Sequence, residues 1–264
     1  MILDSVGATP PPVPKGPLMT TIPALDRSAG RLLVVGAHSA DFVWRAAGAV
    51  AAFVQGGGEA KVVALTYGER GESGVLWQEE GQTEENVKKI RHGEAERASQ
   101  HLGASFEAFD LGDYPLVNDH SDIERLAELM RDFAPTVVLT HPDQDPFNPD
   151  HPVAYQMVQK ARLMTSGAGV ESGFKTAPPS EFLVFEPHQP ELCGFVPSVF
   201  VDITAVFEQK KAAMAEMKAQ AYLQTYYAER AEHRGNHARK VTGNKEIRQA
   251  EAFMRLVPNV VGSL

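Results

Sequence analysis

The stretch "RLLVVGAHSADFVWRAAG", residues 31–48, decides the fold. Its first eight residues are rich in leucine and valine and end in Gly-Ala-His, which is typical of a buried parallel strand that runs into a loop. The loop then places His38 and Asp41 three positions apart. Ser39 and Ala40, which lie between them, are poor metal ligands and poor proton carriers. The stretch therefore predicts an α/β fold with two polar ligands at the carboxyl end of its first strand.

The alternation of strand and helix continues along the chain. Short apolar runs predict further strands over residues 60–68, 105–112, 136–141, 180–188 and 198–204. Helical patterns cover residues 42–58, 83–103, 121–135, 148–164 and 205–235, the last as one helix or two. Thr83 is expected to cap the second helix, and Ser121 with Glu124 predicts a capping box on the third. This order specifies a Rossmann-like, doubly wound and mostly parallel α/β sheet with helices on both faces.

The domain organisation is simple. No internal repeat or linker interrupts residues 30–264, so they are expected to form one catalytic domain. Residues 1–29 are rich in proline and lack hydrophobic periodicity, which predicts a flexible leader, with either Met1 or Met19 as the translation start. Residues 240–258 are interpreted as a C-terminal helix that packs on a partner subunit. Nothing else in the sequence specifies a homo-oligomer, so the oligomeric state stays open.

Composition excludes several classes of function. The formal net charge of −9 argues against nucleic-acid binding, but a small anionic substrate can still bind where arginines gather in a cleft. No apolar run approaches the roughly 20 residues that a membrane helix needs. The chain has one cysteine, Cys193, which fits a reducing compartment and a cytoplasmic location.

Two clusters of histidine and aspartate are expected to meet at one edge of the sheet. In doubly wound sheets, ligands bind beyond the carboxyl ends of the strands, where the strand order reverses, here between the first and fourth strands. His38 and Asp41 follow the first strand, and His151 lies in the segment after the fourth. Together they predict a three-ligand metal site that keeps a position open for water or substrate. Imidazole and carboxylate suit Zn²⁺ best, while iron, manganese and cobalt stay open.

The motifs around these residues resemble those of the LmbE-like/PIG-L zinc de-N-acetylases of N-acetylglucosamine conjugates. That family has "AHPDD" after its first strand and "HPDH" at the start of a later helix, where this chain has "AHSAD" and "NPDH". The resemblance implies a metal held by His38, Asp41 and His151. Two positions depart from the family. Ala40 replaces the aspartate taken as the general base, and Asn148 replaces the histidine thought to stabilise the tetrahedral intermediate.

A narrower resemblance covers most of residues 31–193. The segments "AHSADFVWR", "YGERGES", "LGDYPL", "DPFNPDHP" and "FEPHQPELC" are similar to those of the 4-oxalomesaconate hydratases, also called 4-carboxy-2-hydroxymuconate hydratases. The resemblance implies a hydro-lyase of gallate and protocatechuate 4,5-cleavage pathways. Such an enzyme adds water to a conjugated alkene and gives 4-carboxy-4-hydroxy-2-oxoadipate. A metal that polarises the substrate as a Lewis acid makes the loss of the hydrolase base at Ala40 understandable.

Hydration still needs groups that move protons. Glu69, after the second strand, and His188, at the end of the fifth, are the predicted acid/base pair, with Glu72 and His141 as reserves. A loop salt bridge of Glu69 with Arg70 is an equally plain reading of that residue. His188, taken without the resemblance, also reads as a hydrogen-bonded loop histidine.

A small polycarboxylate substrate also needs cations and polar donors. Arg70, Arg45 and Arg91 are the candidates, because a guanidinium pairs bidentately with a carboxylate, and Asn148 is a further predicted substrate contact. Two other functions stay open. One is a zinc-dependent N-deacetylase of an N-acetylglucosamine-type conjugate, with its base moved to Glu69 or Asp150. The other is a non-catalytic module that keeps the metal for sensing or structure.

Overall fold

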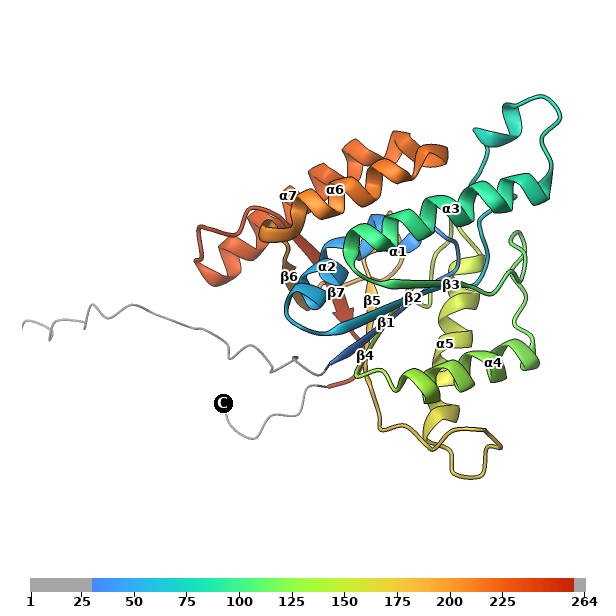
Figure 1. The fold of residues 1–264 in the computed structure, drawn as a ribbon. Helices are drawn as coiled ribbons and strands as arrows, with labels where there is room; N and C mark the ends of the chain where they lie inside the picture. Colours follow the sequence, from blue (N-terminus) through green and yellow to red (C-terminus); the bar gives the residue numbers. More distant parts are fainter. Residues whose placement is uncertain (1–29, 259–264) are drawn as a thin grey trace, which may run out of the picture.

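A computed structural model describes residues 30–258, and the leader predicted for residues 1–29 lies outside these described residues (Figure 1). One seven-stranded sheet runs through the described part of the chain in the order β3-β2-β1-β4-β5-β7-β6. The first five strands pair in parallel, and β7 pairs antiparallel with both β5 and β6. The strands are β1 Arg31–Gly36, β2 Glu59–Ala64, β3 Ser105–Ala108, β4 Val137–Thr140, β5 Glu181–Phe185, β6 Val199–Asp202 and β7 Ala250–Arg255.

Helices cover both faces of the sheet, as predicted (Figure 1). Side chains alternate along β1, so Leu32 and Val34 enter one core while Leu33 and Val35 enter the other. Helices α1, α2, α3, α6 and α7 pack on the first core, and α4 and α5 on the second. The helices are α1 Asp41–Arg45, α2 Ala47–Gln55, α3 Glu84–Leu102, α4 His120–Phe133, α5 Asp150–Ser166, α6 Phe207–Glu216 and α7 Gln224–Thr242.

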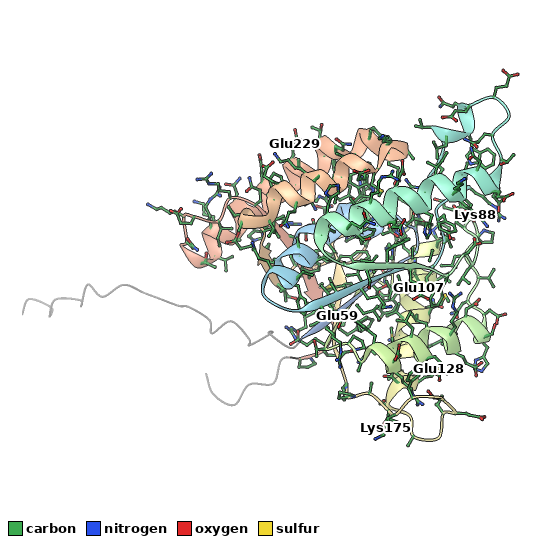
Figure 2. The ribbon with its side chains drawn as sticks, viewed as in Figure 1. Glu59, Lys88, Glu107, Glu128, Lys175 and Glu229 are labelled. Carbon is green, nitrogen blue, oxygen red and sulfur yellow. The ribbon has the colours of Figure 1, made fainter. Side chains whose placement is uncertain are left out.

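The outer faces of these helices are polar. Glu229 of α7 and Glu128 of α4 lie on opposite sides of the molecule, away from the sheet (Figure 2). None of the helices within residues 30–258 has the length and apolar character that crossing a membrane requires. Short 3-10 turns complete the connections: η1 Leu76–Gln78, η2 Pro190–Leu192, η3 Thr204–Val206 and η4 Lys218–Leu223.

Two predicted helix starts have different outcomes. Thr83 is the N-cap of α3, and its hydroxyl accepts a hydrogen bond from the backbone N–H of Asn86 at 3.2 Å, as predicted. The capping box at Ser121 and Glu124 was wrong, because α4 begins earlier, at His120, and is capped by Asp119. The Asp119 carboxylate accepts from the backbone N–H of Ser121 at 2.9 Å. Asp119, two positions before Ser121, supplies the cap instead, so the helix begins two residues earlier than predicted.

The prediction of a C-terminal helix over residues 240–258 was also wrong. Residues 250–255 form β7, which lies between β5 and β6 in the sheet. The alanine, glutamate and methionine of this segment favour a helix, but pairing with the neighbouring strands makes the segment extended. Glu251 of β7 is buried, accepts hydrogen bonds from the N–H groups of Gly48 and Ala49, and pairs with Lys210 at 2.5 Å. The C-terminal segment thus completes the sheet and caps the first turn of α2.

The reversal of strand order lies where the sequence placed it. β1 is hydrogen-bonded to β2 on one side and to β4 on the other, and all three run in parallel. Their carboxyl ends therefore open onto one edge of the sheet, where the loop after β1 meets the loop after β4. The first of these loops carries His38, and α5, which follows the second, carries His151.

Candidate metal and catalytic site

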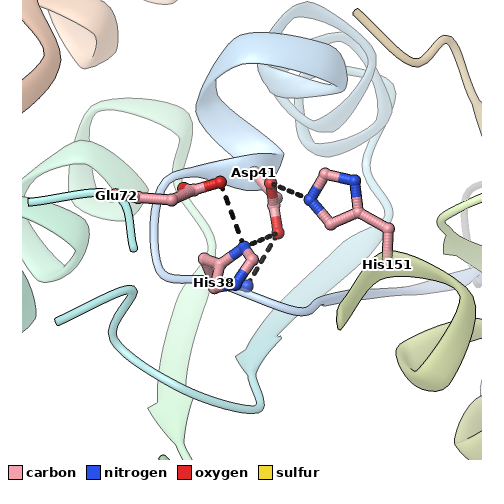
Figure 3. Close-up of side chains that lie close together, drawn as sticks. All are labelled: His38, Asp41, Glu72 and His151. Carbon is pink, nitrogen blue, oxygen red and sulfur yellow. Dashed lines mark hydrogen bonds and ion pairs between the residues drawn. The ribbon is translucent and has the colours of Figure 1, made fainter. Parts of the chain in front are cut away.

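Four side chains converge at this edge of the sheet. His38, Asp41, Glu72 and His151 each offer a ligand atom, and these atoms all lie within 4.8 Å of one another (Figure 3). They come from the loop after β1, the first residue of α1, the loop after β2 and the first turn of α5. The structure thus brings together the three predicted metal ligands and adds Glu72 to them.

The loop after β1 turns tightly to present two of these side chains. Asp41 accepts the backbone N–H of His38 on Oδ2 at 2.7 Å, which closes the turn. A Cβ atom at Gly36 would lie 2.9 Å from the Asp41 Cβ and 3.0 Å from the His38 carbonyl oxygen. Residue 36 must therefore be glycine for the strand to approach the turn this closely.

Each of the two histidines is oriented by a carboxylate from outside the group of four. His38 Nε2 lies 3.2 Å from Asp150 Oδ2, and His151 Nδ1 lies 2.7 Å from Asp145 Oδ2. The remaining nitrogens, His38 Nδ1 and His151 Nε2, are buried and face carboxylate oxygens of the group, with Glu72 Oε1 3.2 Å from the first and Asp41 Oδ1 3.7 Å from the second. Metal-binding histidines characteristically give one ring nitrogen to a carboxylate and the other to the metal. The donor set therefore fits a divalent metal ion.

Asp41 is the most constrained member of the group. Its Oδ1 accepts from Arg45 at 2.6 Å, and its Oδ2 lies 2.9 Å from His141 Nε2. Burial alone would raise the pKa of Asp41, but His141 and Arg45 hold it well below its usual range. Burial and the neighbouring His151 lower the pKa of His141 to about 3, so that ring is neutral at pH 7. Asp41 is thus a fixed, ionised carboxylate beside the neutral ring of His141, which suits a metal ligand.

Glu72 differs from its neighbours in its access to solvent. Its side chain is 16% exposed, whereas those of His38 and Asp41 are 0% and 1% exposed. Its Oε1 lies 3.2 Å from His38 Nδ1 and accepts from the Asn148 amide at 3.1 Å. Burial would raise the pKa of Glu72, but His38 outweighs that effect and lowers the pKa to about 2. Glu72 is therefore an ionised carboxylate at the boundary between the buried ligands and the cavity.

A cavity of about 320 Å³ opens in front of this group. His188 and Tyr227 lie in its wall, with His188 Nδ1 3.4 Å from the Tyr227 hydroxyl. Burial and then Arg45 lower the pKa of His188, so the ring is neutral at pH 7 in the free protein. The remaining lining residues are Trp44, Arg45, Gly71, Glu72, Tyr114, Asp145, Phe147, Asn148, His151, Gln189, Gln220, Tyr222 and Leu223.

Glu69, the predicted partner of His188, does not line the cavity. Its carboxylate is buried and accepts the backbone N–H of Tyr67 at 3.1 Å, and it lies 3.6 Å from Lys88. Burial raises its pKa. In this position Glu69 shapes the turn after β2, and that turn presents Glu72.

The three predicted arginines have three different surroundings. Arg45 lies in the cavity wall and pairs with Asp41. Arg70 is directed to the surface, where it pairs with Glu84 at 3.2 Å. Arg91 is fully buried and donates to Glu94 and Gln220 at 2.9 and 3.0 Å. Of the predicted substrate contacts, the structure therefore places Arg45 and Asn148 at the cavity and leaves Arg70 and Arg91 outside its lining.

Some site residues were not anticipated from the sequence. Asp145 is part of "HPDQDPFNPDH", so its place after the fourth strand is a signal that the sequence does contain. Asp150 was considered only as a displaced hydrolase base, whereas it contacts His38. Gln220 has no signal of its own, because it lies far along the chain in the turn η4.

Comparison with known proteins identifies the family of this chain. The family model described as GlcNAc-PI de-N-acetylase (PIG-L) matches residues 33–162. A 4-oxalmesaconate hydratase of Pseudomonas putida is 43% identical over 235 residues, which cover 88% of this chain and 91% of that protein. The chain belongs to the PIG-L family. This confirms the resemblance seen in the sequence motifs. The range of this chain that the family model matches contains His38, Asp41, Glu72 and His151.

Solved structures agree with this assignment. The crystal structure of GalB, the 4-carboxy-2-hydroxymuconate hydratase of Pseudomonas putida, matches with a TM-score of 0.86 and 43% identity, over 89% of this chain and 99% of that one. The N,N'-diacetylchitobiose deacetylase of Pyrococcus horikoshii matches with a TM-score of 0.70 at 19% identity, over 86% and 84% of the two chains. The second match shows that this chain shares its α/β fold with a deacetylase.

Proposed function

We propose that this enzyme is a hydratase that adds water to 4-oxalomesaconate or its tautomer 4-carboxy-2-hydroxymuconate, giving 4-carboxy-4-hydroxy-2-oxoadipate in the breakdown of aromatic compounds. The 43% identity to a hydratase over most of both chains carries the proposal. A cytoplasmic location is part of it, since the one cysteine suits a reducing compartment.

The carboxylates of the site support hydration over amide hydrolysis. Ala40 takes the place of the aspartate that the related deacetylases are taken to use as a base, and its side chain is buried in the hydrophobic core. Two carboxylates border the cavity instead: Asp145, which is engaged with His151, and Glu72, in the loop after β2. The site therefore keeps its ligands while its proton-accepting group approaches from another element.

The proposed metal is zinc, held by His38, Asp41 and His151. Two imidazoles and one carboxylate form a donor set that zinc takes in catalytic sites with three protein ligands. When bound, the ion supplies a Lewis acid for the oxo or enol oxygen of the substrate.

In this proposal, Glu72 and His188 carry the two protons of the reaction. Glu72 accepts a proton as a water molecule adds its oxygen to one alkene carbon, and His188 delivers a proton to the other carbon. His188 is neutral in the free protein, but a bound polycarboxylate brings negative charge beside the ring and favours its protonated form. The substrate itself thus prepares the acid that the reaction needs.

Recognition of the carboxylates falls to one arginine and several neutral donors. Among residues 30–258, Arg45 is the arginine in the cavity lining, and its Nε is buried without a hydrogen-bond partner. The amide of Asn148 and the hydroxyl of Tyr227 offer further donors in the same wall. We propose that Arg45 binds one substrate carboxylate and that the neutral donors hold the others.

The decisive experiment follows the ultraviolet band of the conjugated muconate with purified protein. We expect the band to disappear, and we expect a chelator to stop its loss and added zinc to restore it. Acetate release from an N-acetylglucosamine conjugate serves as the control reaction and should not be detected. A stable muconate band together with acetate release would show a deacetylase, and inertness toward both would leave a binding module.

A further inference from the structure

A buried carboxamide connects Glu72 to a part of the chain outside residues 33–162, the segment that the family model matches. Gln220 lies in the turn η4, between α6 and α7, and is 4% exposed. Its Nε2 donates to Glu72 Oε2 at 3.4 Å, and its side chain forms part of the cavity wall. A C-terminal element thus contacts the carboxylate that the proposed reaction uses.

The neighbours of Gln220 determine which way its amide points. Its Oε1 accepts from the Trp44 indole at 3.3 Å and from the Arg91 guanidinium at 3.0 Å. Both partners are donors only, so they require the oxygen of the amide. The nitrogen must then face Glu72, which can only accept while it is ionised. The direction of this hydrogen bond therefore follows from three independent partners.

The turn that carries Gln220 is itself held in place. The Glu94 carboxylate of α3 accepts from Arg91 at 2.9 Å and from the backbone N–H of Ala219 at 3.0 Å. Arg91 and Glu94 are both buried. Arg91 thereby holds Gln220 directly and, through Glu94, also holds the residue before it. A buried polar network whose members are all paired is rigid, and it transmits that rigidity to the group at its end.

We infer that Gln220 is a positioning residue of the hydration reaction. Its fixed amide holds one oxygen of Glu72, while Asn148 and His38 lie against the other. Glu72 consequently has one orientation toward the cavity instead of several, which general-base action on a bound water requires. The inference rests on the proposed function, in which Glu72 accepts the proton of water.

The variant Gln220→Glu tests this role with almost no change in shape. One carboxylate oxygen keeps the contacts to Trp44 and Arg91, and the other replaces the donor that faced Glu72 with an acceptor. We expect kcat to fall about 10- to 100-fold, since a displaced catalytic group costs rates of this order. KM should rise as well, because the new charge lies in the wall of the cavity that binds the anionic substrate. Gln220→Met, which is neutral and similar in size, should lower kcat as well, with KM changing less than about threefold. Gln100→Glu, at an exposed position of α3, is the matched charge control and should leave kcat unchanged.

A double-mutant cycle with Glu72→Gln separates positioning from a general structural role. If Gln220 acts through Glu72, Gln220→Glu should slow the Glu72→Gln enzyme by less than about twofold, with metal content and thermal midpoint recorded for each variant. If Gln220→Glu lowers kcat equally in the parent enzyme and in Glu72→Gln, or in neither, the inference about Gln220 is overturned while the proposed function stands. Full turnover of Glu72→Gln itself would contradict the proposed role of Glu72 and remove the basis of the inference with it. Gln220→Met supplies the same comparison if Gln220→Glu does not fold.

Discussion

Glu72→Gln is expected to lower kcat by about 10²- to 10⁴-fold, the range that the loss of a general base typically causes. The amide keeps the shape of the carboxylate and can still meet Asn148, but it cannot accept a proton from water. Metal content should stay close to stoichiometric, because His38, Asp41 and His151 remain and Glu72 is the member of the group that is not fully buried. Stopped-flow or steady-state loss of the muconate band gives the rate, and elemental analysis of the same sample gives the metal.

Glu69→Gln is the matched control for this variant. It makes the same chemical change three residues earlier in the same loop, at a carboxylate that does not line the cavity. We expect its kcat to stay within about tenfold of the parent enzyme, with a lower thermal midpoint because the buried contacts to Tyr67 and Lys88 weaken. A large loss in Glu69→Gln with little loss in Glu72→Gln would restore Glu69 as the proton carrier. Loss of metal in Glu72→Gln would make Glu72 a ligand instead of a base.

The sequence predicted the sheet and the point of its reversal because both depend on local patterns. Apolar runs such as residues 31–36 are long enough to be recognised as buried strands, and the crossover helices determine their parallel order. Residues 250–255 escaped recognition since their composition favours a helix. Only the pairing of β7 with strands from elsewhere in the chain makes that segment extended, and such pairing has no local signature.

The metal ligands of the site were likewise predictable from the sequence, whereas the choice of the proton carrier was not. His38, Asp41 and His151 follow strand ends, so the topology alone brings them together. The choice between Glu69 and Glu72 depends on how the loop after β2 folds. Asp113 sets that fold by accepting the backbone N–H groups of Arg70 and Gly71 at 2.9 and 2.7 Å. A contact made by a residue more than forty positions away cannot be read from the motif itself, and the same holds for Gln220.

Asp41→Asn is expected to remove the metal and to destabilise the fold together. The substitution keeps the size of the side chain but removes the charge that Arg45 and His141 contact. Arg45 would then be a buried cation without its partner, a change that typically costs about 3–5 kcal/mol of the free energy of unfolding. For a chain of this size that corresponds to a fall in the thermal midpoint of roughly 10 °C.

Asp143→Asn provides the comparison for Asp41→Asn, since Asp143 is exposed and lies in the loop after β4. Asp143→Asn should keep its metal during dialysis, and its turnover and thermal midpoint should match those of the parent enzyme. Asp41→Asn should lose the metal and the turnover, and its thermal midpoint should fall. The thermal midpoints of the metal-free parent and of metal-free Asp41→Asn separate the loss of the metal from the loss of the ion pair. If the apo forms of parent and Asp41→Asn unfold at the same temperature, the instability comes from metal loss alone and the buried Arg45–Asp41 pair contributes nothing. If the apo variant is still the less stable, the pair stabilises α1 independently of the ion, and the metal binds to a site that the protein has already built.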